Sequence, residues 1–226
     1  MEKQKISIVI PTLNEGETIK SVVERCLPFA DELIVIDGHS TDNTRDIAQE
    51  LGVKVILDGM KGKGEALRHA VKCVTGDIIV FIDADGSHIP EDIPKLLKPI
   101  IEGEADHVSG SRLIGGSSEL HGGFDECFRL MGSSFITACI NWRFKVQLSE
   151  SQNGFRAIRT NIIKKLYLRE NITTIEQEMI IKTLKKGFRM AEVPTHEHKR
   201  IAGYSKIKLR NVSFRYVYSL IKYLIF

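Results

Sequence analysis

Short runs of branched apolar residues recur through the first hundred positions of the chain. They cover residues 6–10, 33–36, 53–57 and 78–82, and a longer amphipathic stretch follows each run. Nearly continuous Ile and Val runs suit strands that are covered on both faces, as in a parallel sheet with right-handed crossovers. The pattern therefore predicts repeated strand–helix–strand units and an α/β fold class.

Size and charge narrow the class of protein. The chain has 226 residues, 42% of them hydrophobic, so we expect one domain with a short appendage. A formal net charge of +3 argues against a dedicated nucleic-acid binder. Four cysteines without a CxxC pair, and an N-terminus without a secretory apolar core, lead us to expect reduced thiols and a cytoplasmic location.

The residues just after each predicted strand are the first candidates for a site, because ligands collect beyond the carboxyl ends of parallel strands. Residues 11–15, Pro-Thr-Leu-Asn-Glu, lack the glycines of a dinucleotide-binding turn. After the second strand, the Asp37 carboxylate is able to bind a base or a ribose. We interpret Asp42, a few positions later, as a helix cap.

A loop rich in glycine and lysine follows the third predicted strand. Its residues 59–64 read Gly-Met-Lys-Gly-Lys-Gly and directly precede a predicted helix. Backbone amides and a cation at a helix start suit a diphosphate. A solvated loop would carry the same sequence.

Two carboxylates end the fourth predicted strand, in the motif Asp83-Ala84-Asp85. This concentration of negative charge predicts a cation nearby. Hard oxygen ligands with a single-residue spacer suit Mg²⁺ or Mn²⁺, which completes its shell with water and substrate phosphate. The alternative is a turn that caps the following helix.

In this order, the four strand ends resemble the nucleotide-sugar half of family 2 glycosyltransferases, which have the GT-A fold. The resemblance places a nucleotide-sugar half in residues 5–112 and an acceptor half in 113–210, within one domain over 1–210. It implies a nucleotide-sugar donor and a metal held by Asp83 and Asp85. The donor-binding residues that it implies are Pro11, Thr12, Asn14, Glu15, Asp37, Lys63, Gly64, Asp83, Ala84 and Asp85.

Later motifs look like those of polyprenyl-phosphate sugar synthases, the subgroup that includes the dolichol-phosphate mannose synthases. That subgroup places acceptor-phosphate contacts at positions matching Arg129 and Ser133. The motifs are Gly110-Ser111-Arg112, Asn153-Gly154-Phe155-Arg156, the run over 192–200, and Gly203-Tyr204-Ser205-Lys206.

The chain departs from that pattern at two places. Ser87 stands where the subgroup usually has a glutamine, which leaves the third metal ligand open. The common Asp-Asp-Gly becomes Asp37-Gly38-His39, which leaves the choice between uracil and guanine open.

The charge of a phosphate acceptor determines which side chains its site must supply. A phosphate monoester is largely ionised near neutral pH, so it needs cations rather than a general base. We therefore predict inverting transfer of a hexose, mannose or glucose, from a GDP- or UDP-sugar to a polyprenyl or dolichyl phosphate. The predicted catalytic residues are Asp85 at the metal and, around the acceptor phosphate, Arg112, Arg129, Arg200 and Lys206, with Ser133 as a further contact.

Three other functions stay open. Glu150, Glu176 or Glu178 would be the general base if the acceptor were a sugar hydroxyl. The last two lie on a helix predicted over 174–186, where we expect them to be exposed to solvent. A non-catalytic nucleotide-sugar-binding subunit would not need paired metal carboxylates, and a nucleotidyltransferase should have a basic, glycine-rich turn at 11–15.

The end of the chain is strongly basic, with no acidic residue in 199–226. An amphipathic helix is predicted over 211–226, with a polar stripe of Asn211, Arg215, Ser219 and Lys222. At about 24 Å it is short for a transmembrane span. We expect it to lie on the inner face of the cytoplasmic membrane. The alternatives are packing on its own domain, on another copy, or on a membrane-subunit partner.

Overall fold

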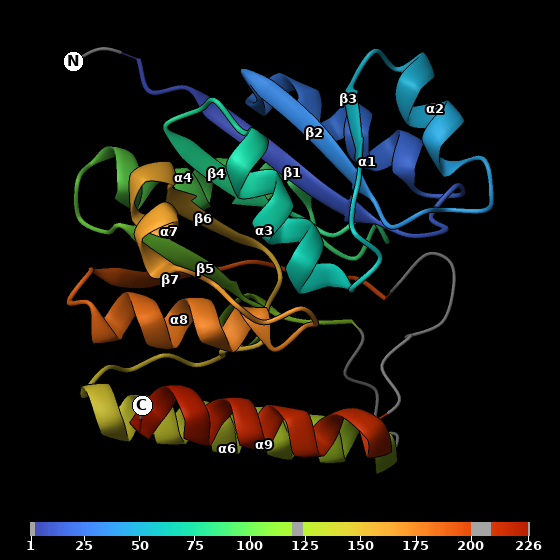
Figure 1. Cartoon of the computed structure of the whole chain (residues 1–226). Helices are drawn as coiled ribbons and strands as arrows, with labels where there is room; N and C mark the ends of the chain where they lie inside the picture. The colour runs from blue at the N-terminus through green and yellow to red at the C-terminus, as the bar shows by residue number, and fades with distance from the viewer. Residues whose placement is uncertain (1–2, 119–123, 200–208, 226) are drawn as a thin grey trace.

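The computed structural model describes residues 3–118, 124–199 and 209–225; for 124–129 and 209–213 it describes the backbone alone. In this part of the chain, seven strands form one mixed sheet in the order β3-β2-β1-β4-β6-β5-β7. Helices cover both faces of the sheet, and two long helices form a further layer (Figure 1). The strands are β1 Ile6–Thr12, β2 Glu32–Asp37, β3 Lys54–Leu57, β4 Ile78–Phe81, β5 His107–Ser111, β6 Arg156–Arg159 and β7 Met190–Pro194.

The four predicted strands are confirmed as β1 to β4, which pair in parallel. Ile8 of β1 lies between Leu33 of β2 and Val80 of β4, and Ile36 of β2 pairs with Ile56 of β3. The runs over 33–36 and 78–82 are apolar at every position because helices cover both faces of the centre of the sheet, whereas β3, at the edge of the sheet, includes the exposed Lys54. The carboxyl ends of β1, β2 and β4 therefore meet at one edge, where the predicted donor residues lie.

The second half of the chain completes the same sheet. β6 lies antiparallel between β4 and β5, and β7 is parallel to β5. The sequence pattern did not reveal these three short strands, since their apolar runs are interrupted by polar residues such as Ser109 and Arg156, which are nevertheless buried. One sheet thus crosses the border between the predicted halves at residue 112.

Two groups of helices pack on the sheet. On one face, Val22 of α1 and Leu96 of α4 join a core cluster, and on the other, Leu67 of α3, Ile163 of α7 and Met179 of α8 join a second. The bounds are α1 Ile19–Cys26, α2 Thr44–Glu50, α3 Lys63–Cys73, α4 Ile93–Ile101, α5 Arg112–Gly115, α7 Thr160–Leu166 and α8 Ile175–Lys185, with single 3₁₀ turns at Leu27–Phe29 and Pro90–Asp92.

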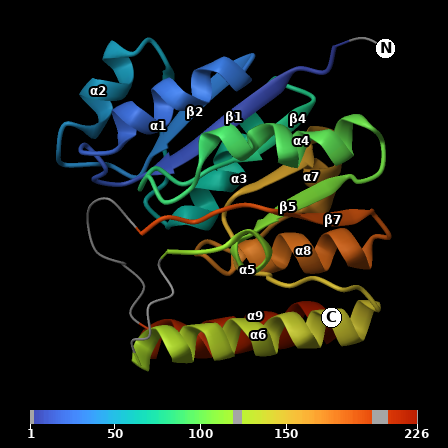
Figure 2. The same ribbon diagram turned by 180° about the vertical axis from the view of Figure 1, so that it is seen from behind.

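The outer layer consists of α6, Phe124–Phe144, and α9, Leu209–Ile225. The two helices lie side by side along the face of α8 that points away from the sheet (Figures 1 and 2). Ile140 of α6, Ile180 of α8 and Leu220 of α9 belong to one buried cluster. Lys222 and Tyr223 of α9 also donate hydrogen bonds to Glu170, at 3.0 and 2.8 Å. The layer is therefore fastened to the domain by both apolar and polar contacts.

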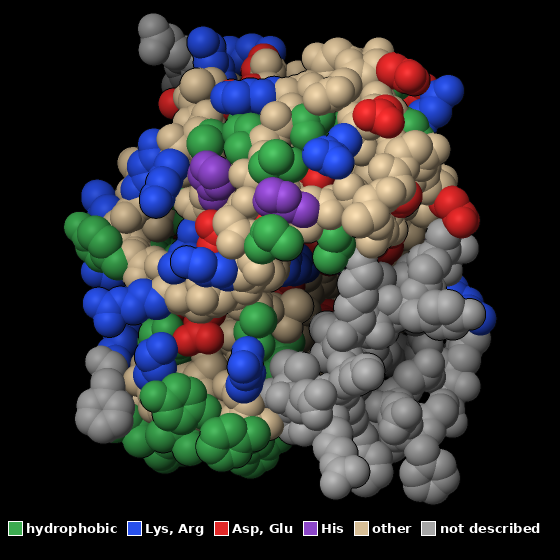
Figure 3. Space-filling view, turned by 45° about the vertical axis from the view of Figure 1, so that its right-hand side comes forward, with side chains coloured by type: hydrophobic (Ala, Val, Ile, Leu, Met, Phe, Trp, Pro, Cys, Tyr) green, Lys and Arg blue, Asp and Glu red, His purple; other side chains and the backbone are tan. Residues whose placement is uncertain are grey.

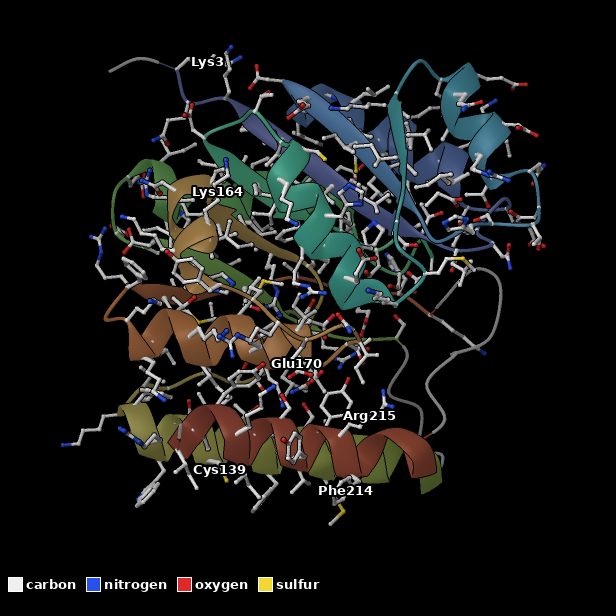
Figure 4. The ribbon with its side chains drawn as sticks, in the orientation of Figure 1. Lys3, Cys139, Lys164, Glu170, Phe214 and Arg215 are labelled. Atoms are coloured by element: carbon white, nitrogen blue, oxygen red, sulfur yellow. The ribbon has the colours of Figure 1, made fainter. Side chains whose placement is uncertain are left out.

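The tail helix predicted over 211–226 is confirmed as α9, and the structure decides which face meets the domain. Ser219 of the predicted polar stripe is buried, and Lys222 points toward Glu170. Phe214 and Ile225, by contrast, are 78% and 66% exposed. Glu170 lies on the domain side of α9 in Figure 4, and Phe214 lies on the opposite side. Within the described residues, no helix is both long and apolar enough to span a membrane.

Candidate functional site

The loops after β1 and β2 are tied together at the edge of the sheet. The Asn14 amide donates to Ser40 Oγ at 2.8 Å, and Asn14 Oδ1 accepts from the Thr41 amide, also at 2.8 Å. Asn14 has a φ of +54°, a conformation that asparagine adopts more readily than most residues. These bonds hold the loop that starts at Pro11 and the loop that starts at Gly38 as one wall of the site.

The predicted cap residue Asp42 extends this wall. Its carboxylate accepts hydrogen bonds from the amide of Thr44, the first residue of α2, and from the amide of Gly16, each at 3.0 Å. Glu15 is placed in the same way, because its amide donates to Thr44 Oγ1 at 2.9 Å. The N-cap position of α2 is Asn43, so Asp42 lies one residue before the cap that we predicted, although its carboxylate accepts from the first helical amide.

Asp37 is fully buried behind the wall. Its carboxylate accepts from the Ser40 amide at 2.9 Å and from the Ser40 hydroxyl, and Arg45 Nε lies 3.6 Å away. Thr12 is also buried, but its hydroxyl has no hydrogen-bond partner among the residues that the structure describes. The Asp37 carboxylate is therefore satisfied mainly by its own loop, whereas the buried Thr12 hydroxyl is left without a partner in the described part of the chain.

The end of β4 brings a cation and two acids together. Lys63 Nζ, at the start of α3, lies 2.7 Å from Asp83 Oδ1 and 2.8 Å from Glu176 Oε1 of α8. Burial alone would lower the pKa of Lys63, but the two carboxylates raise it above its ordinary value. Lys63 is therefore a firmly protonated ammonium lying on a predicted metal ligand.

Asp85 is held by the residue that departs from the subgroup pattern. The Ser87 amide and hydroxyl both donate to Asp85 Oδ1, at 3.0 and 2.7 Å. The next residue, His88, is buried, stacks on Phe155 and places its Nε2 3.9 Å from Asp83 Oδ2. Sequence reasoning gave His88 no role, and its position directly after the acidic motif was the signal that could have found it.

Gly154, in the predicted Asn-Gly-Phe-Arg motif, lies directly against the two charges. A Cβ built on Gly154 would lie 2.7 Å from Asp83 Oδ2 and 2.8 Å from Lys63 Nζ. Real Cβ atoms do not make contacts this close, so any larger residue here would displace Asp83 or Lys63. The buried core residue Ala84 lies between the two carboxylates in sequence and supports the turn from below.

These residues fit a divalent metal. Asp83 and Asp85 offer hard carboxylate oxygens, and the Lys63 ammonium shows that the Asp83 oxygens accept a cation in this place. Among the described residues, no group of three or more His, Cys, Asp or Glu side chains is arranged to hold a metal. A metal on the two aspartates would therefore complete its shell with water and phosphate oxygens, as Mg²⁺ commonly does.

At the end of the loop over residues 59–64, the amides of Gly64 and Glu65 hold the neighbouring chain, and the side chain of Lys63 faces the predicted site. The Gly64 and Glu65 amides donate to the Asn171 carbonyl at 2.8 and 3.2 Å, so they hold the loop before α8. A Cβ on Gly64 would lie 2.6 Å from the Glu170 carbonyl oxygen, which explains the glycine by close backbone approach. Lys63 is the residue of this loop that contacts the predicted metal ligand Asp83.

Arg112, a predicted acceptor-phosphate contact, lies in an ion-pair cluster. Its guanidinium is 2.7 Å from Glu150 Oε1 and 2.6 Å from Glu197 Oε2. Burial raises the pKa of Glu150, although Arg112 opposes this shift. The two carboxylates offset the charge of Arg112, so the cluster fixes the end of β5 against residues 149–150.

The expectation that Glu176 and Glu178 are exposed is wrong. Both are buried, since α8 is covered by the sheet on one side and by the outer layer on the other. Glu178 accepts from the amides of Arg169 and Glu170 at 2.8 Å each and pairs with Lys182 at 2.6 Å. Sequence alone could not distinguish this helix from a surface helix, because the layers that bury it, and Lys63 as the partner of Glu176, come from distant parts of the chain.

The remaining predicted acceptor contacts are only partly visible. Ser133 is partly exposed on α6, and its carbonyl accepts from Thr137 Oγ1 at 2.9 Å. Thr137 in turn hydrogen-bonds Ser151 at 2.8 Å, three residues before the glycine that lies against Asp83. The side chain of Arg129, and all of Arg200 and Lys206, lie outside the described residues. The segment before β6 thus connects α6 to the metal-site carboxylates.

Known proteins resemble this chain over most of its length. Residues 7–190 match the model of glycosyl transferase family 2. Glycosyltransferase AglJ of Haloferax volcanii is 31% identical over 201 residues, 88% of this chain and 64% of that protein. Dolichol-phosphate mannosyltransferase of Pyrococcus furiosus is 31% identical over 232 residues, 97% of this chain. The chain spans 64% of the length of each of these two relatives.

Solved structures show the same architecture. A Mycobacterium tuberculosis glucosyl-3-phosphoglycerate synthase, in complex with Mn²⁺, UDP and glucosyl-3-phosphoglycerate, matches with a TM-score of 0.78 and 26% identity. The match covers 98% of this chain and 80% of that one. The mostly parallel sheet, the acidic motif at the end of β4 and these matches agree: the chain is a GT-A-fold protein that belongs to glycosyl transferase family 2.

Proposed function

We propose that this glycosyltransferase moves a hexose from a GDP- or UDP-sugar to a polyprenyl phosphate. The observation that carries the proposal is that all three candidate bases of the acceptor half are already engaged. Glu150 pairs with Arg112, Glu176 pairs with Lys63, and Glu178 is held by backbone amides. A hydroxyl acceptor needs a carboxylate to take its proton, whereas an ionised phosphate does not.

The donor would bind across the edge formed by β1, β2 and β4. The wall around Asn14 would face the nucleoside, and Lys63 would face the diphosphate. Asp83 and Asp85 would hold Mg²⁺ or Mn²⁺, which when bound supplies positive charge next to the departing diphosphate. The solved relative with Mn²⁺ and UDP supports this arrangement.

The proposed reaction is an in-line displacement. A phosphate oxygen of the acceptor forms a bond to the anomeric carbon from the face opposite the diphosphate. The bond from that carbon to the diphosphate oxygen breaks, and the nucleoside diphosphate leaves with the electron pair, so the configuration inverts. No proton has to be removed, and catalysis depends on aligning two anions that repel each other.

Cations must hold the acceptor phosphate in this step. Arg112 would have to leave one of its two carboxylate partners to bind it, so we assign the first contacts to Arg129, Arg200 and Lys206. Ser133 lies on the same helix as Arg129, one turn further along. Arginine suits this role because its planar guanidinium forms paired hydrogen bonds with phosphate oxygens.

The relatives support glycosyl transfer and differ in the acceptor that their names imply. One is a dolichol-phosphate mannosyltransferase, and others are glucosyl-3-phosphoglycerate synthases. The test is transfer of radiolabelled sugar from UDP-glucose, UDP-mannose, GDP-glucose and GDP-mannose, with Mg²⁺ or Mn²⁺, onto polyprenyl phosphate in detergent or onto 3-phosphoglycerate in water. Labelled lipid is the expected product. Labelled phosphoglycerate without labelled lipid would contradict the proposed acceptor.

We also propose that α6 and α9 bring the site to a membrane surface. The two helices expose large apolar side chains on the side away from the domain, and Figure 3 shows hydrophobic side chains gathered there with Lys and Arg above them. Residues 130–144 and 214–225, the part of the two helices whose side chains the structure describes, include no acidic residue, and Asp125 and Glu126 lie at the start of α6. The most exposed members of this two-helix face are Met131, Phe135, Trp142, Phe214, Tyr218 and Ile225.

The chemistry of this face matches an anionic bilayer. Apolar side chains enter the boundary of the acyl chains, while the exposed Arg143 and Arg215 are placed to meet anionic headgroups. Co-sedimentation with vesicles that contain anionic lipid tests the proposal. Binding that falls with salt is expected, and a chain that stays in the supernatant with such vesicles would contradict it.

A further inference from the structure

Three elements bring their charges together at the ammonium of Lys63. The lysine comes from the start of α3, Asp83 from the end of β4, and Glu176 from the first turn of α8. The ammonium lies within 2.8 Å of an oxygen of each acid. A protein cation therefore occupies oxygens of the carboxylate that we assign to the metal.

Glu176, the second acid beside Lys63, is unusual because it is a charged residue at a buried position of α8. Glu176 is 4% exposed, and an apolar residue would pack more cheaply at a buried position on α8. Its carboxylate meets the Lys63 ammonium, and its backbone carbonyl accepts from Arg156 Nη1 at 3.1 Å. A buried carboxylate needs a partner that offsets its charge, and the partner here is the ammonium of Lys63.

We propose that Lys63 is a stand-in cation that occupies Asp83 until a metal binds, and that Glu176 is the residue that positions it. When the metal takes Asp83, Glu176 keeps the ammonium at the site, where the donor diphosphate becomes its next partner. When a metal binds without nucleotide, the Lys63–Asp83 ion pair is lost and no new ion pair forms in its place. The metal together with a nucleoside diphosphate replaces it with a new ion pair.

The consequence is cooperative binding of metal and nucleotide. Each should raise the affinity for the other by the same factor, because coupling between two ligands is reciprocal. The inference rests on the proposed metal site at Asp83 but involves no sugar transfer and no acceptor. It can therefore fail while transfer to a lipid phosphate is demonstrated, and it can hold if the acceptor proves to be a different molecule.

The experiment is a titration of Mn²⁺ against the full chain, with free Mn²⁺ measured by electron paramagnetic resonance. It is run without nucleotide, with UDP and with GDP. For the wild-type chain we expect the nucleotide that binds to raise the affinity for Mn²⁺ by about tenfold or more. Equal Mn²⁺ affinity with and without a bound nucleotide would overturn the proposal.

Lys63→Met distinguishes two roles of Lys63, competition with the metal for Asp83 and direct contact with the donor. Without nucleotide, the variant should bind Mn²⁺ about tenfold more tightly than the wild type, because nothing competes for Asp83. Lys61→Met is the matched control: it removes the same charge from an exposed position of the same loop and should leave Mn²⁺ affinity near the wild-type value. If Lys63 only binds the donor, both variants will bind Mn²⁺ alone as the wild type does, which contradicts the proposal.

Glu176→Gln tests whether Glu176 positions Lys63. It also replaces Lys63→Met as the test if that variant does not fold, since Lys63→Met leaves two acids unpaired. Glu176→Gln keeps the size of the side chain and removes its charge, so Lys63 is less well held when displaced. We expect the gain in Mn²⁺ affinity caused by the nucleotide to fall about fivefold. Circular dichroism on heating verifies that the variant is folded. An unchanged gain in the folded variant would overturn the role of Glu176.

Discussion

Two regions of the molecule differ in how their accessible side chains are held. One is the edge of the sheet with the predicted donor residues, and the other is the two-helix face of α6 and α9. At the edge, the charged and polar side chains are held by partners from distant parts of the chain, as Lys63 is by Asp83 and Glu176. On the two-helix face, large apolar side chains such as Trp142, 84% exposed, face water. The edge is organised before a ligand arrives, whereas the face gains energy only when another surface covers it.

The difference reflects the forces at each place. Charges in a partly buried site must be offset at all times, since an unpaired buried charge costs several kcal/mol. An exposed apolar side chain costs less, and covering one contributes about 1.5–3 kcal/mol. The edge is therefore sensitive to single atoms, and the face should respond to the sum of several side chains.

The largest effect should come from removing the charge of Asp83 at the edge. For Asp83→Asn we expect sugar transfer to fall about a thousandfold, because a metal would lose a charged ligand next to the leaving group. The measurement is the initial rate of labelled-product formation at saturating Mn²⁺. Asp46→Asn, an exposed change on α2, is the matched control and should keep the wild-type rate. Full activity of Asp83→Asn would remove the basis of the metal site.

The next largest effect should come from adding one carbon atom to the edge. In Gly154→Ala the new Cβ would lie 2.7 Å from Asp83 Oδ2, so the carboxylate or the chain must move. We expect transfer to fall about a hundredfold, as small displacements of reacting groups cost about this much. Gly132→Ala, whose Cβ meets nothing within 4 Å, is the control. Equal rates for both variants would mean that the close approach at Gly154 has no functional role.

The two-helix face should respond differently from the edge. The double variant Trp142→Ser with Phe214→Ser should lower binding to anionic vesicles at least tenfold, since each large side chain contributes about 1.5–3 kcal/mol when covered. Transfer to a short, water-soluble polyprenyl phosphate should be unchanged. Ile101→Ser, an exposed apolar change on α4, is the control. If the double variant loses soluble transfer as well, the face is part of the site and the comparison fails.

The smallest effect concerns the sheet that supports both regions. His107, the first residue of β5, is buried, and its Nδ1 forms a hydrogen bond with Thr183 Oγ1 of α8 at 3.0 Å. Burial and, secondarily, the charge of Arg156 lower its pKa well below the ordinary value. The unfolded chain therefore binds more protons in acid, so the contribution of His107 to stability is present above about pH 6.5 and is lost as the pH falls, by about 1.4 kcal/mol per unit.

Denaturant unfolding between pH 7.5 and 5 measures this loss. In His107→Asn the slope of the unfolding free energy with pH should be smaller by about one proton. His69→Asn, at a partly exposed position on α3, should keep the wild-type slope. An unchanged slope in His107→Asn would mean that other groups account for the acid sensitivity.

The amino-acid sequence by itself determined the first half of the fold and the edge of the sheet at which the predicted donor residues lie. Four apolar runs predicted β1 to β4 because a strand covered on both faces has little room for polar side chains. Once these strands are parallel, their carboxyl ends share one edge of the sheet, where the residues that follow each strand lie. The contact between Lys63 and Asp83 is not among these conclusions, since β2 and β1 lie between β3 and β4. Local pattern and the direction of the strands were sufficient for these conclusions.

Only the tertiary structure decided which groups meet. Glu176 looked like an exposed helix residue, and its burial against Lys63 joins positions more than a hundred residues apart. The need for glycine at position 154 comes from the closeness of Asp83, which no local pattern encodes. The periodicity of α9 predicted two faces but not which one packs on the domain. Glu170 and the neighbouring helices decide that, because they bind Lys222 and Tyr223 and leave Phe214 in water.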